Sequence, residues 1–211
     1  DAVCPFVKKI HKIVLDNSSE EVATIIAGDE NHPEVKGIKS CAKGESYVIS
    51  NDSDVEILIN NAGTQNEEDI DINLKALIYI TEKYGVQPHI KSILNIGSAS
   101  AHTGAEFPEY CASKGGVVAY TKNTALRVAK YGATCNSLDP GGVLTPLNEC
   151  VMNDEKLWEE IMNETPLKRW ATPEEMADWA YFLTVTNKFC TGQSILVDGG
   201  EAINYNFVWK D

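Results

Sequence analysis

The sequence predicts a three-layer α/β fold, in which helices cover both faces of a mainly parallel sheet. Short continuous apolar runs such as VATIIAGD, VEILINNAG and QSILVDGG are typical of strands that are buried on both faces. Segments with apolar residues at helical spacing alternate with these runs. Three runs end in turns of small residues, NNAG, GSAS and DPGG. Ligands bind beyond the carboxyl ends of such strands, so we expect a site at these turns.

The predicted elements follow one another without an internal repeat. The strands are expected at VATIIAGD, SYVIS, VEILINNAG, KSILNIGSAS, ATCNSLDPGG and QSILVDGG. Helices are expected at residues 6–15, HPEVKGI, DINLKALIYITEKYG, 110–131, 154–163 and 173–187. Gly85 and Gly132 end two of these helices, because glycine readily adopts the conformation that closes a helix. The sequence TPEE opens the last helix as a capping box with proline at the first helical position.

Composition and charge exclude several classes of partner. The chain has 211 residues, enough for one domain with a substantial core. Its formal net charge of −13 repels phosphate backbones and anionic lipid, so no nucleic-acid or membrane partner is expected. No apolar run is long enough for a transmembrane helix, and the first residues lack the order of a secretory signal. Six scattered cysteines without a C-x-x-C pair indicate reduced thiols in a cytoplasmic protein.

Four chemically suggestive residues stand in order along the chain: Asn73, Ser98, Tyr110 and Lys114. Each is weak alone, because a Tyr-x-x-x-Lys pair also occurs in helices where the ring packs and the lysine reaches water. A tyrosine titrates near pKa ~10, which is too high for efficient proton transfer at neutral pH. A lysine one helical turn away stabilises the phenolate and lowers that pKa. The pair at the start of EYCASKGGVVAYTK therefore has the residues of a proton donor and its activating cation.

With the turns NNAG, PGGVLT and VDGG in the same order, residues 56–201 resemble the short-chain dehydrogenase/reductase family. The resemblance implies a Rossmann-like sheet, NAD or NADP as cofactor, and a small-molecule carbonyl or secondary alcohol as substrate. It implies that Tyr110 donates the proton, Lys114 holds the nicotinamide ribose, Ser98 binds the substrate oxygen and Asn73 supports a proton-relay water. Ser100 is the rival serine, and Ser98 is preferred because it directly follows the strand.

The resemblance also implies a set of cofactor-binding residues. Ala62 and Gly63 would allow close approach of the cofactor, while Asn61 would bond neighbouring strands. The Val143 backbone and the Thr145 side chain would contact the nicotinamide carboxamide. The full set is Asn61, Ala62, Gly63, Tyr110, Lys114, Pro140, Gly141, Val143 and Thr145. Residues 147–170 are expected to form an amphipathic lid, and the helices of Asn73 and Tyr110 are dimer faces in the family, which predicts a homodimer or homotetramer.

One family feature is missing from the sequence. The family opens with a strand and a turn of the T-G-x-x-x-G-x-G kind, whose glycines bring a helix N-terminus to the cofactor pyrophosphate. The only candidate is IIAGDENHPEV, which has one glycine and presents Asp29 and Glu30 to phosphate with the wrong charge. We therefore expect weak or absent binding of NAD or NADP, and the sequence does not choose between the two.

Residues 1–55 resemble a different family, the iron–sulfur 4-hydroxy-3-methylbut-2-enyl diphosphate reductase. The resemblance rests on DAVCPFVKKIHKIV and GDENHPEVKGI. Cys4 matches one of that family's three cluster ligands, but the other two have no counterpart, and one thiolate cannot hold a cluster. No metal site is therefore expected, and Cys4, His32 and Glu34 are interpreted as an orphan thiol and two retained surface residues.

The two resemblances predict a composite chain. An αβαβ segment at residues 1–55 would replace the N-terminal β-α unit of the fold, and residues 56–211 would continue it as one domain. The expected function is that of an NAD(P)-dependent oxidoreductase. The alternatives are a folded chimeric scaffold without catalysis and, as a minor one, an iron–sulfur isoprenoid reductase fragment.

Overall fold

The structure, a computed structural model, describes residues 55–65, 68–105 and 107–204. Its strands form one parallel sheet in the order β1-β2-β3-β4, which confirms the predicted three-layer class for this part of the chain. The strands are β1 (Ile57–Asn60), β2 (Ser92–Ile96), β3 (Thr134–Pro140) and β4 (Ser194–Val197). The predicted strands VATIIAGD and SYVIS and the predicted helices at 6–15 and HPEVKGI lie outside the described residues.

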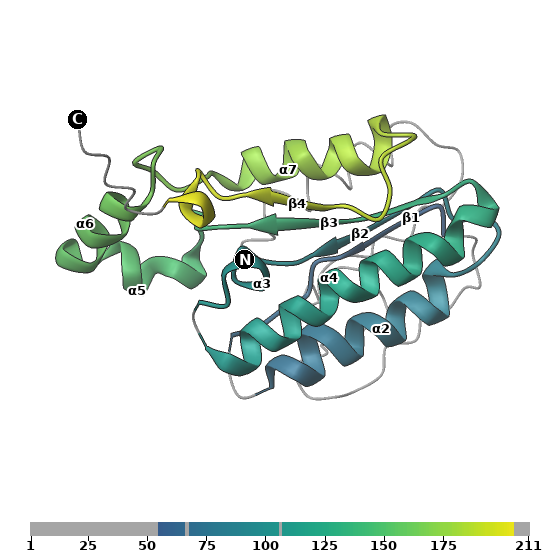
Figure 1. Cartoon of the computed structure of the whole chain (residues 1–211), viewed down its shortest axis with the longest axis horizontal. Helices are drawn as coiled ribbons and strands as arrows, with labels where there is room; N and C mark the ends of the chain where they lie inside the picture. Colours follow the sequence, from purple (N-terminus) through teal and green to yellow (C-terminus); the bar gives the residue numbers. More distant parts are fainter. Residues whose placement is uncertain (1–54, 66–67, 106, 205–211) are drawn as a thin grey trace, which may run out of the picture.

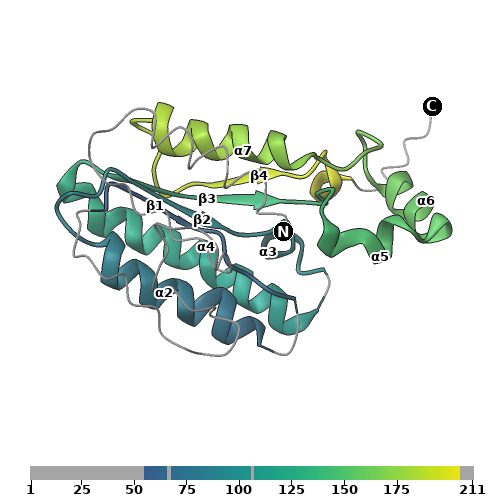
Figure 2. The same cartoon turned by 180° about the vertical axis from the view of Figure 1, so that it is seen from behind.

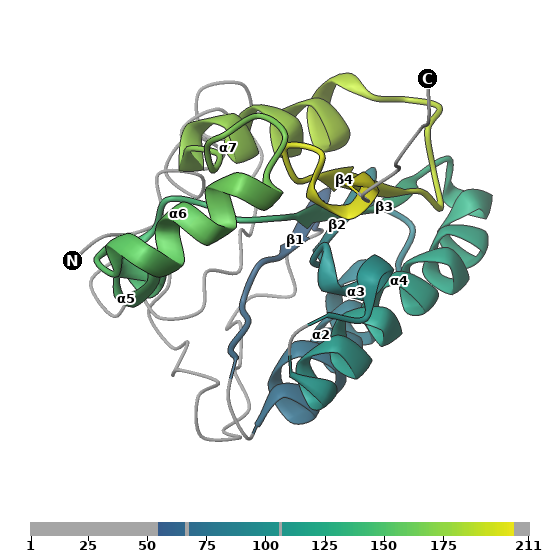
Figure 3. The same ribbon diagram turned by 60° about the vertical axis from the view of Figure 1, so that its left-hand side comes forward.

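Helices cover both faces of this sheet. On one face lie α4 (Pro108–Val128) and a long helix that contains α2 (Leu77–Ile80) between π-helical turns at Ile70–Ala76 and Thr81–Gly85. On the other face lies α7 (Pro173–Tyr181), continued by a π-helical turn at Phe182–Thr186 (Figures 1 and 3). The view from behind in Figure 2 shows the same three layers.

Shorter helices gather near the carboxyl ends of the strands. The one-turn α3 (Ser100–Thr103) follows β2, and α5 (Glu149–Met152) and α6 (Glu155–Glu164) project beyond the end of the sheet (Figure 1). Short 3₁₀ turns occupy Pro146–Asn148, Ala129–Tyr131 and Glu201–Ile203. The sequence predicted α6 within one residue at each end but did not predict α3 or α5, which are too short for a helical period to show.

Each face of the sheet has its own apolar core. Leu94 and Leu138 point toward α7 and pack with Met176, Ala177 and Leu183. The alternating strand positions point the other way, where Leu58, Ile93 and Cys135 pack with Ala125 and Val128. Because both faces are covered, most strand residues are apolar or buried, and this is the pattern that identified the strands in the sequence. Among the described residues, no helix combines the length and apolar composition needed to cross a bilayer.

The helix boundaries follow from local chemistry. Pro108 occupies the first turn of α4, which begins two residues earlier than predicted. Gly132 closes that helix with φ of +74°, as its position in the sequence indicated. At α7, the Glu175 N–H donates to Thr172 Oγ1 at 3.3 Å and the Thr172 N–H donates to Glu175 Oε2 at 2.9 Å, so the predicted capping box is confirmed.

A buried polar network joins the strand ends to the helices that carry the candidate site. Asn60 donates through Nδ2 to Thr81 Oγ1 at 2.9 Å and to Asn95 Oδ1 at 2.7 Å, and Asn95 donates to Thr121 Oγ1 at 2.9 Å. The sequence interpretation gave this inter-strand role to Asn61, which was wrong because Asn61 is exposed. Asn60 is the last residue of β1, and strand alternation turns its side chain toward β2 and α4.

Candidate active site

The first turns of α4 place Tyr110 and Lys114 on the same face of the helix. Lys114 is only 6% exposed, and its ammonium donates to the Ile96 carbonyl at 3.0 Å. That nitrogen lies 5.7 Å from the centroid of the half-buried Tyr110 ring. Lys114 is therefore not a surface lysine that reaches water past a packed tyrosine, which was the alternative interpretation of the pair.

Burial changes the acid–base behaviour of Lys114. Desolvation lowers the pKa of Lys114 from 10.5 to about 8, while the negative charges of Asp139 and Asp69 act in the opposite direction. At neutral pH the side chain is still mainly an ammonium ion, but one held in a dry environment. A cation in such an environment acts more strongly on a neighbouring phenol than one in water.

Asn73 connects the turn after β1 to α4. The Thr64 N–H donates to Asn73 Oδ1 at 2.7 Å, and Asn73 Nδ2 donates to the Thr64 carbonyl at 2.9 Å and to Ser113 Oγ at 3.2 Å. A Cβ placed on Gly63 would lie 3.2 Å from Asn73 Oδ1 and 3.4 Å from Lys114 Nζ. A side chain at position 63 would therefore crowd both the Asn73 amide and the Lys114 ammonium.

Ser98 lies in the turn after β2 and is 8% exposed. Its Oγ accepts hydrogen bonds from the Ser100 hydroxyl at 2.8 Å and the Ser100 N–H at 3.2 Å, so Ser100 contacts Ser98 directly. The turn is attached to β3 on both sides of Ser98. The Gly97 N–H donates to the Leu138 carbonyl and the Ala99 N–H donates to the Pro140 carbonyl, both at 2.8 Å.

The turn after β3 is held between β4 and the segment before α7. The Gly141 N–H donates to the Val197 carbonyl at 3.0 Å, and Val143 forms an isolated parallel bridge with Ala171. At Gly142 a Cβ would lie 2.0 Å from Nε1 of the buried Trp170 indole, so no other residue fits there without movement of the ring. Thr145, half-buried, follows the bridge and precedes the 3₁₀ turn. The Val143 carbonyl accepts from Asn148 Nδ2 at 2.8 Å.

The structure thus brings Gly63, Asn73 and Lys114 together, with Tyr110 on the same helix. The hydrogen bond from Lys114 Nζ to the carbonyl of Ile96, the last residue of β2, connects Lys114 to the turn that carries Ser98. Pro140, Gly141, Val143 and Thr145 lie in the neighbouring turn after β3, while Ala62 is half-buried beside the exposed Asn61 and Gly63. The glycine-rich turn that the family uses for pyrophosphate would lie among residues outside the described part.

Sequence reasoning missed the buried carboxylate of Asp139. Its side chain is fully buried at the end of β3, accepts from the Ser137 and Ser194 hydroxyls, and lies 2.5 Å from His102 Nε2. An acidic residue inside the predicted strand ATCNSLDPGG, where burial on both faces is expected, was the available signal. Ser194 Oγ lies 3.2 Å from the same His102 nitrogen that meets Asp139, so these residues do not form a serine-hydrolase relay, which uses both imidazole nitrogens.

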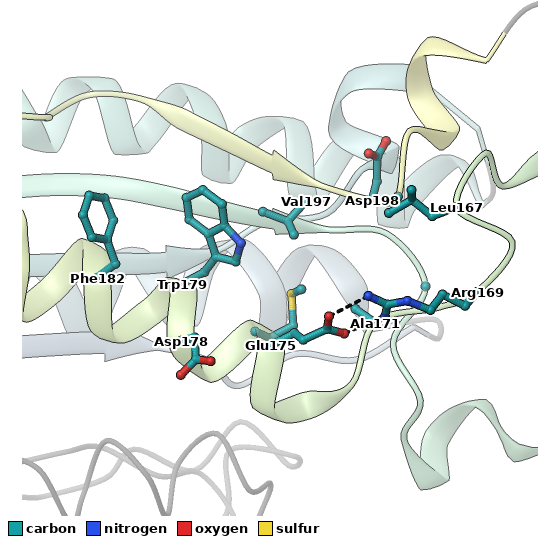
Figure 4. Close-up of a pocket in the computed structure, with 12 residues that line it drawn as sticks. Leu167, Arg169, Ala171, Glu175, Asp178, Trp179, Phe182, Val197 and Asp198 are labelled. Carbon is teal, nitrogen blue, oxygen red and sulfur yellow. Dashed lines mark hydrogen bonds and ion pairs between the residues drawn. The ribbon is translucent and has the colours of Figure 1, made fainter.

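A separate pocket of about 480 Å³ lies over α7 and β4, away from the catalytic candidates (Figure 4). Trp179, Phe182 and Leu167 contribute apolar surface to its lining. Arg169 and Glu175, joined by two hydrogen bonds of 2.7 Å, stand at one side of it. None of Asn73, Ser98, Tyr110 and Lys114 lines it, so this pocket is not the centre of the candidate chemistry.

Metal ligation finds no support in the described part of the chain. Among those residues, no group of three or more His, Cys, Asp or Glu side chains is arranged to hold an ion. The described cysteines Cys111, Cys135, Cys150 and Cys190 are free thiols. Burial raises the pKa of Cys135 to about 12, which makes that thiol unreactive. The residues Cys4, His32 and Glu34 lie outside the described part.

Comparisons with known proteins find a matching family model and several relatives. The family model described as "Enoyl-(Acyl carrier protein) reductase" matches residues 39–201. The chain is 30% identical to NADPH-dependent aldehyde reductase 1, chloroplastic, of Arabidopsis thaliana over 216 residues, which covers 92% of this chain and 71% of that protein. It is also 30% identical to the 3-oxoacyl-[acyl-carrier-protein] reductase FabG of Thermotoga maritima over 223 residues, covering 88% and 90% of the two chains.

Solved structures show the same similarity. A putative gluconate dehydrogenase from Agrobacterium tumefaciens superposes with a TM-score of 0.66 at 31% identity, covering 72% of this chain and 67% of that one. A putative 2-deoxy-d-gluconate 3-dehydrogenase from the same organism, with bound NADP, gives 0.65 at 30% identity and covers 71% and 68%.

The lowered pKa of Lys114 predicts a pH dependence of stability. Between pH 8 and 10.5 the unfolded chain keeps the Lys114 proton that the folded chain has lost. The free energy of unfolding of the unsubstituted protein (the parent) should therefore rise with pH relative to that of Lys114→Met. The gain should reach at most about 3 kcal/mol in the free energy of unfolding. Denaturant unfolding of both proteins at several pH values measures it. Lys122→Met, on the exposed face of α4, serves as the control. A parent–Lys114→Met difference that does not change over this range would contradict the desolvation of Lys114.

Proposed function

The chain belongs to the short-chain dehydrogenase/reductase family, and from this premise we propose that it is an NAD(P)-dependent oxidoreductase that interconverts a carbonyl compound and a secondary alcohol. The observation that carries the proposal is the desolvated Lys114 ammonium beside Tyr110. A buried lysine costs stability, and such groups concentrate at functional sites, which favours an enzyme over a scaffold without catalysis.

The proposed catalytic residues are Asn73, Ser98, Tyr110 and Lys114. Tyr110 donates its phenolic proton to the substrate oxygen during reduction and takes it back during oxidation. Lys114 lowers the free energy of the phenolate that forms. Ser98 donates a hydrogen bond to the substrate oxygen, because the two contacts from Ser100 occupy its acceptor positions and leave its own proton available. Asn73 holds the Thr64 backbone and supports the water through which the proton is replaced.

The residues at the strand ends fit the nicotinamide-ribose end of NAD or NADP. Glycine at position 63 keeps a side chain away from the Lys114 ammonium, and we propose that this ammonium holds the hydroxyls of the nicotinamide ribose. Neither hydrogen bond of the Val143–Ala171 bridge uses the Val143 N–H, so that group, with Thr145, is proposed to contact the carboxamide. The bound cofactor supplies the hydride, and the protein supplies position and proton transfer. The remaining proposed cofactor contacts are Asn61, Ala62, Pro140 and Gly141.

Small carbonyl compounds are the proposed substrates. The relatives named above include an aldehyde reductase, a 3-oxoacyl-carrier-protein reductase and gluconate-type dehydrogenases, so aldehydes, 3-oxoacyl thioesters and sugar acids form the first panel to test. We further propose a cytoplasmic protein that assembles as a homodimer or homotetramer through the helices of Asn73 and Tyr110. Those two helices are linked to each other by the Glu82–Arg127 ion pair.

The composite origin of the chain stays a second, separate proposal, with residues 1–55 as one unit and 56–211 as the other. The comparisons give it no support, because the family match begins at residue 39, ahead of the proposed junction. A folded scaffold without catalysis would be the conclusion if no member of the substrate panel reacted with either cofactor.

Replacement of Tyr110 by phenylalanine tests the proposed chemistry. Tyr110→Phe keeps the ring and removes the proton donor, so kcat with the reactive carbonyl should fall by a factor of about 10²–10⁴. Steady-state oxidation of NADH or NADPH measures the loss, and circular dichroism checks the fold. Tyr131→Phe, in the 3₁₀ turn that follows the far end of α4, is the matched control and should leave kcat unchanged. Parent-like activity of Tyr110→Phe would remove Tyr110 from the mechanism.

The same assay can distinguish the roles of Ser98 and Ser100, the two serines that follow β2. Ser98→Ala should lower kcat by a factor of about 10² or more, because it removes the donor to the substrate oxygen. Ser100→Ala removes only the contacts that orient Ser98 and should lower kcat by about tenfold or less. The reverse order of the two losses would assign the substrate contact to Ser100.

A further inference from the structure

A buried carboxylate that the proposed mechanism does not use lies next to the candidate site. Asp139 is fully buried near the carboxyl end of β3, on the face of the sheet that α4 covers. Burying an ionised group is expensive unless hydrogen bonds and charges compensate it. Here Ser137, Ser194 and His102 contact the two carboxylate oxygens, so its hydrogen-bonding capacity is satisfied.

The position of Asp139 relates it to the Ser98 turn. A Cβ on Gly97 would lie 2.0 Å from Asp139 Oδ1 and 2.8 Å from Ser137 Oγ, so the carboxylate occupies the space that a side chain at position 97 would need. The backbone bonds from Gly97 to Leu138 and from Ala99 to Pro140 bracket Asp139 on the strand. The carboxylate therefore lies directly against the backbone that carries Ser98.

Lys114 approaches the same segment through its bond to the Ile96 carbonyl. The charged groups that act on the buried ammonium come from two other elements, Asp139 on β3 and Asp69 before the helix of Asn73, and both oppose the effect of desolvation. Asp69 is itself 2% exposed and accepts from Asn73 Nδ2 at 3.4 Å. The negative charges of these two buried carboxylates therefore stabilise the ammonium form of Lys114. The ring of Tyr110 is the aromatic neighbour of the same ammonium.

We propose that Asp139 is a positioning residue that keeps Lys114 in its ammonium form and fixes the turn that carries Ser98. The proposal rests on the proposed oxidoreductase function for its catalytic meaning. His102, whose side chain is 31% exposed, is the part of the cluster that reaches solvent. The groups that face Asp139 are His102 from α3, Ser194 from β4, Ser137 from β3 and, at longer range, Lys114 from α4.

This role has a consequence for catalysis at alkaline pH. The phenolate of Tyr110 is stabilised only while Lys114 carries its proton. Without the Asp139 charge, desolvation acts on Lys114 with less opposition, and the ammonium loses its proton at lower pH. The alkaline limit of the reaction therefore moves toward neutral pH. A purely structural role for Asp139 would lower stability or the amount of active protein, but it would not move this limit.

Titration of Lys114 tests the proposal without any cofactor or substrate. The full chain is produced with ¹³C-labelled lysine, Lys114→Met identifies the Lys114 resonance, and the chemical shift is followed against pH. Asp139→Asn should lower the titration midpoint of Lys114 by about one pH unit. Asp71→Asn removes the same charge from a position whose side chain is 69% exposed, and should shift the midpoint by no more than about 0.2 units. A shift in Asp139→Asn no larger than in this control, or a shift upward, overturns the proposal.

A second variant guards against a folding failure. If Asp139→Asn does not fold, Asp139→Ser is measured in its place, and failure of both to fold assigns Asp139 a structural role and overturns the proposal. The pH profile of kcat supplies the catalytic arm, where the alkaline limit should fall by the same amount as the midpoint. A shifted midpoint in a protein without turnover would contradict the proposed function and leave the coupling of Asp139 to Lys114 intact.

Discussion

The candidate site depends on one costly arrangement, the ammonium group of Lys114 held almost entirely out of water. Desolvation pulls its pKa down to about 8, and the compensation comes from the Ile96 carbonyl and from Asp139 and Asp69. A protein keeps such a group only where the surrounding fold determines its position. The end of β2, the residue before the helix of Asn73, the end of β3 and the start of α4 all contribute to that position.

The fold fixes the site through backbone contacts between successive strand ends. The turn after β2 is bonded to β3 on both sides of Ser98, and the turn after β3 is bonded to β4 through Gly141. The turn after β1 is held by Asn73 from the neighbouring helix. Each catalytic candidate is therefore attached to a regular element rather than to a free loop. This rigidity is what proton transfer over hydrogen-bond distances requires.

Much of this arrangement could be predicted from the sequence, because its signals are local. Apolar runs gave the strands, Thr172 and Gly132 gave helix boundaries, and the order of Asn73, Ser98, Tyr110 and Lys114 gave the candidate set. What was missed depends on which face of a strand a residue occupies and what packs against it. Asn60 and Asn61 are equivalent in a sequence, yet only Asn60 bonds the next strand. The contacts of Asp139 with His102 and Ser194 join residues 37 and 55 positions away, which no local pattern reveals.

We propose that the ends of these strands bind the nicotinamide half of NAD or NADP around Lys114, and a cofactor titration can measure this binding. NADH and NADPH are each titrated into the full chain while the fluorescence of the reduced nicotinamide is followed. We expect saturable binding of at least one of them, and a weaker affinity in Lys114→Met, which lacks the group proposed to hold the ribose. Absence of saturable binding of either cofactor up to millimolar concentration, or unchanged affinity in Lys114→Met, would contradict it.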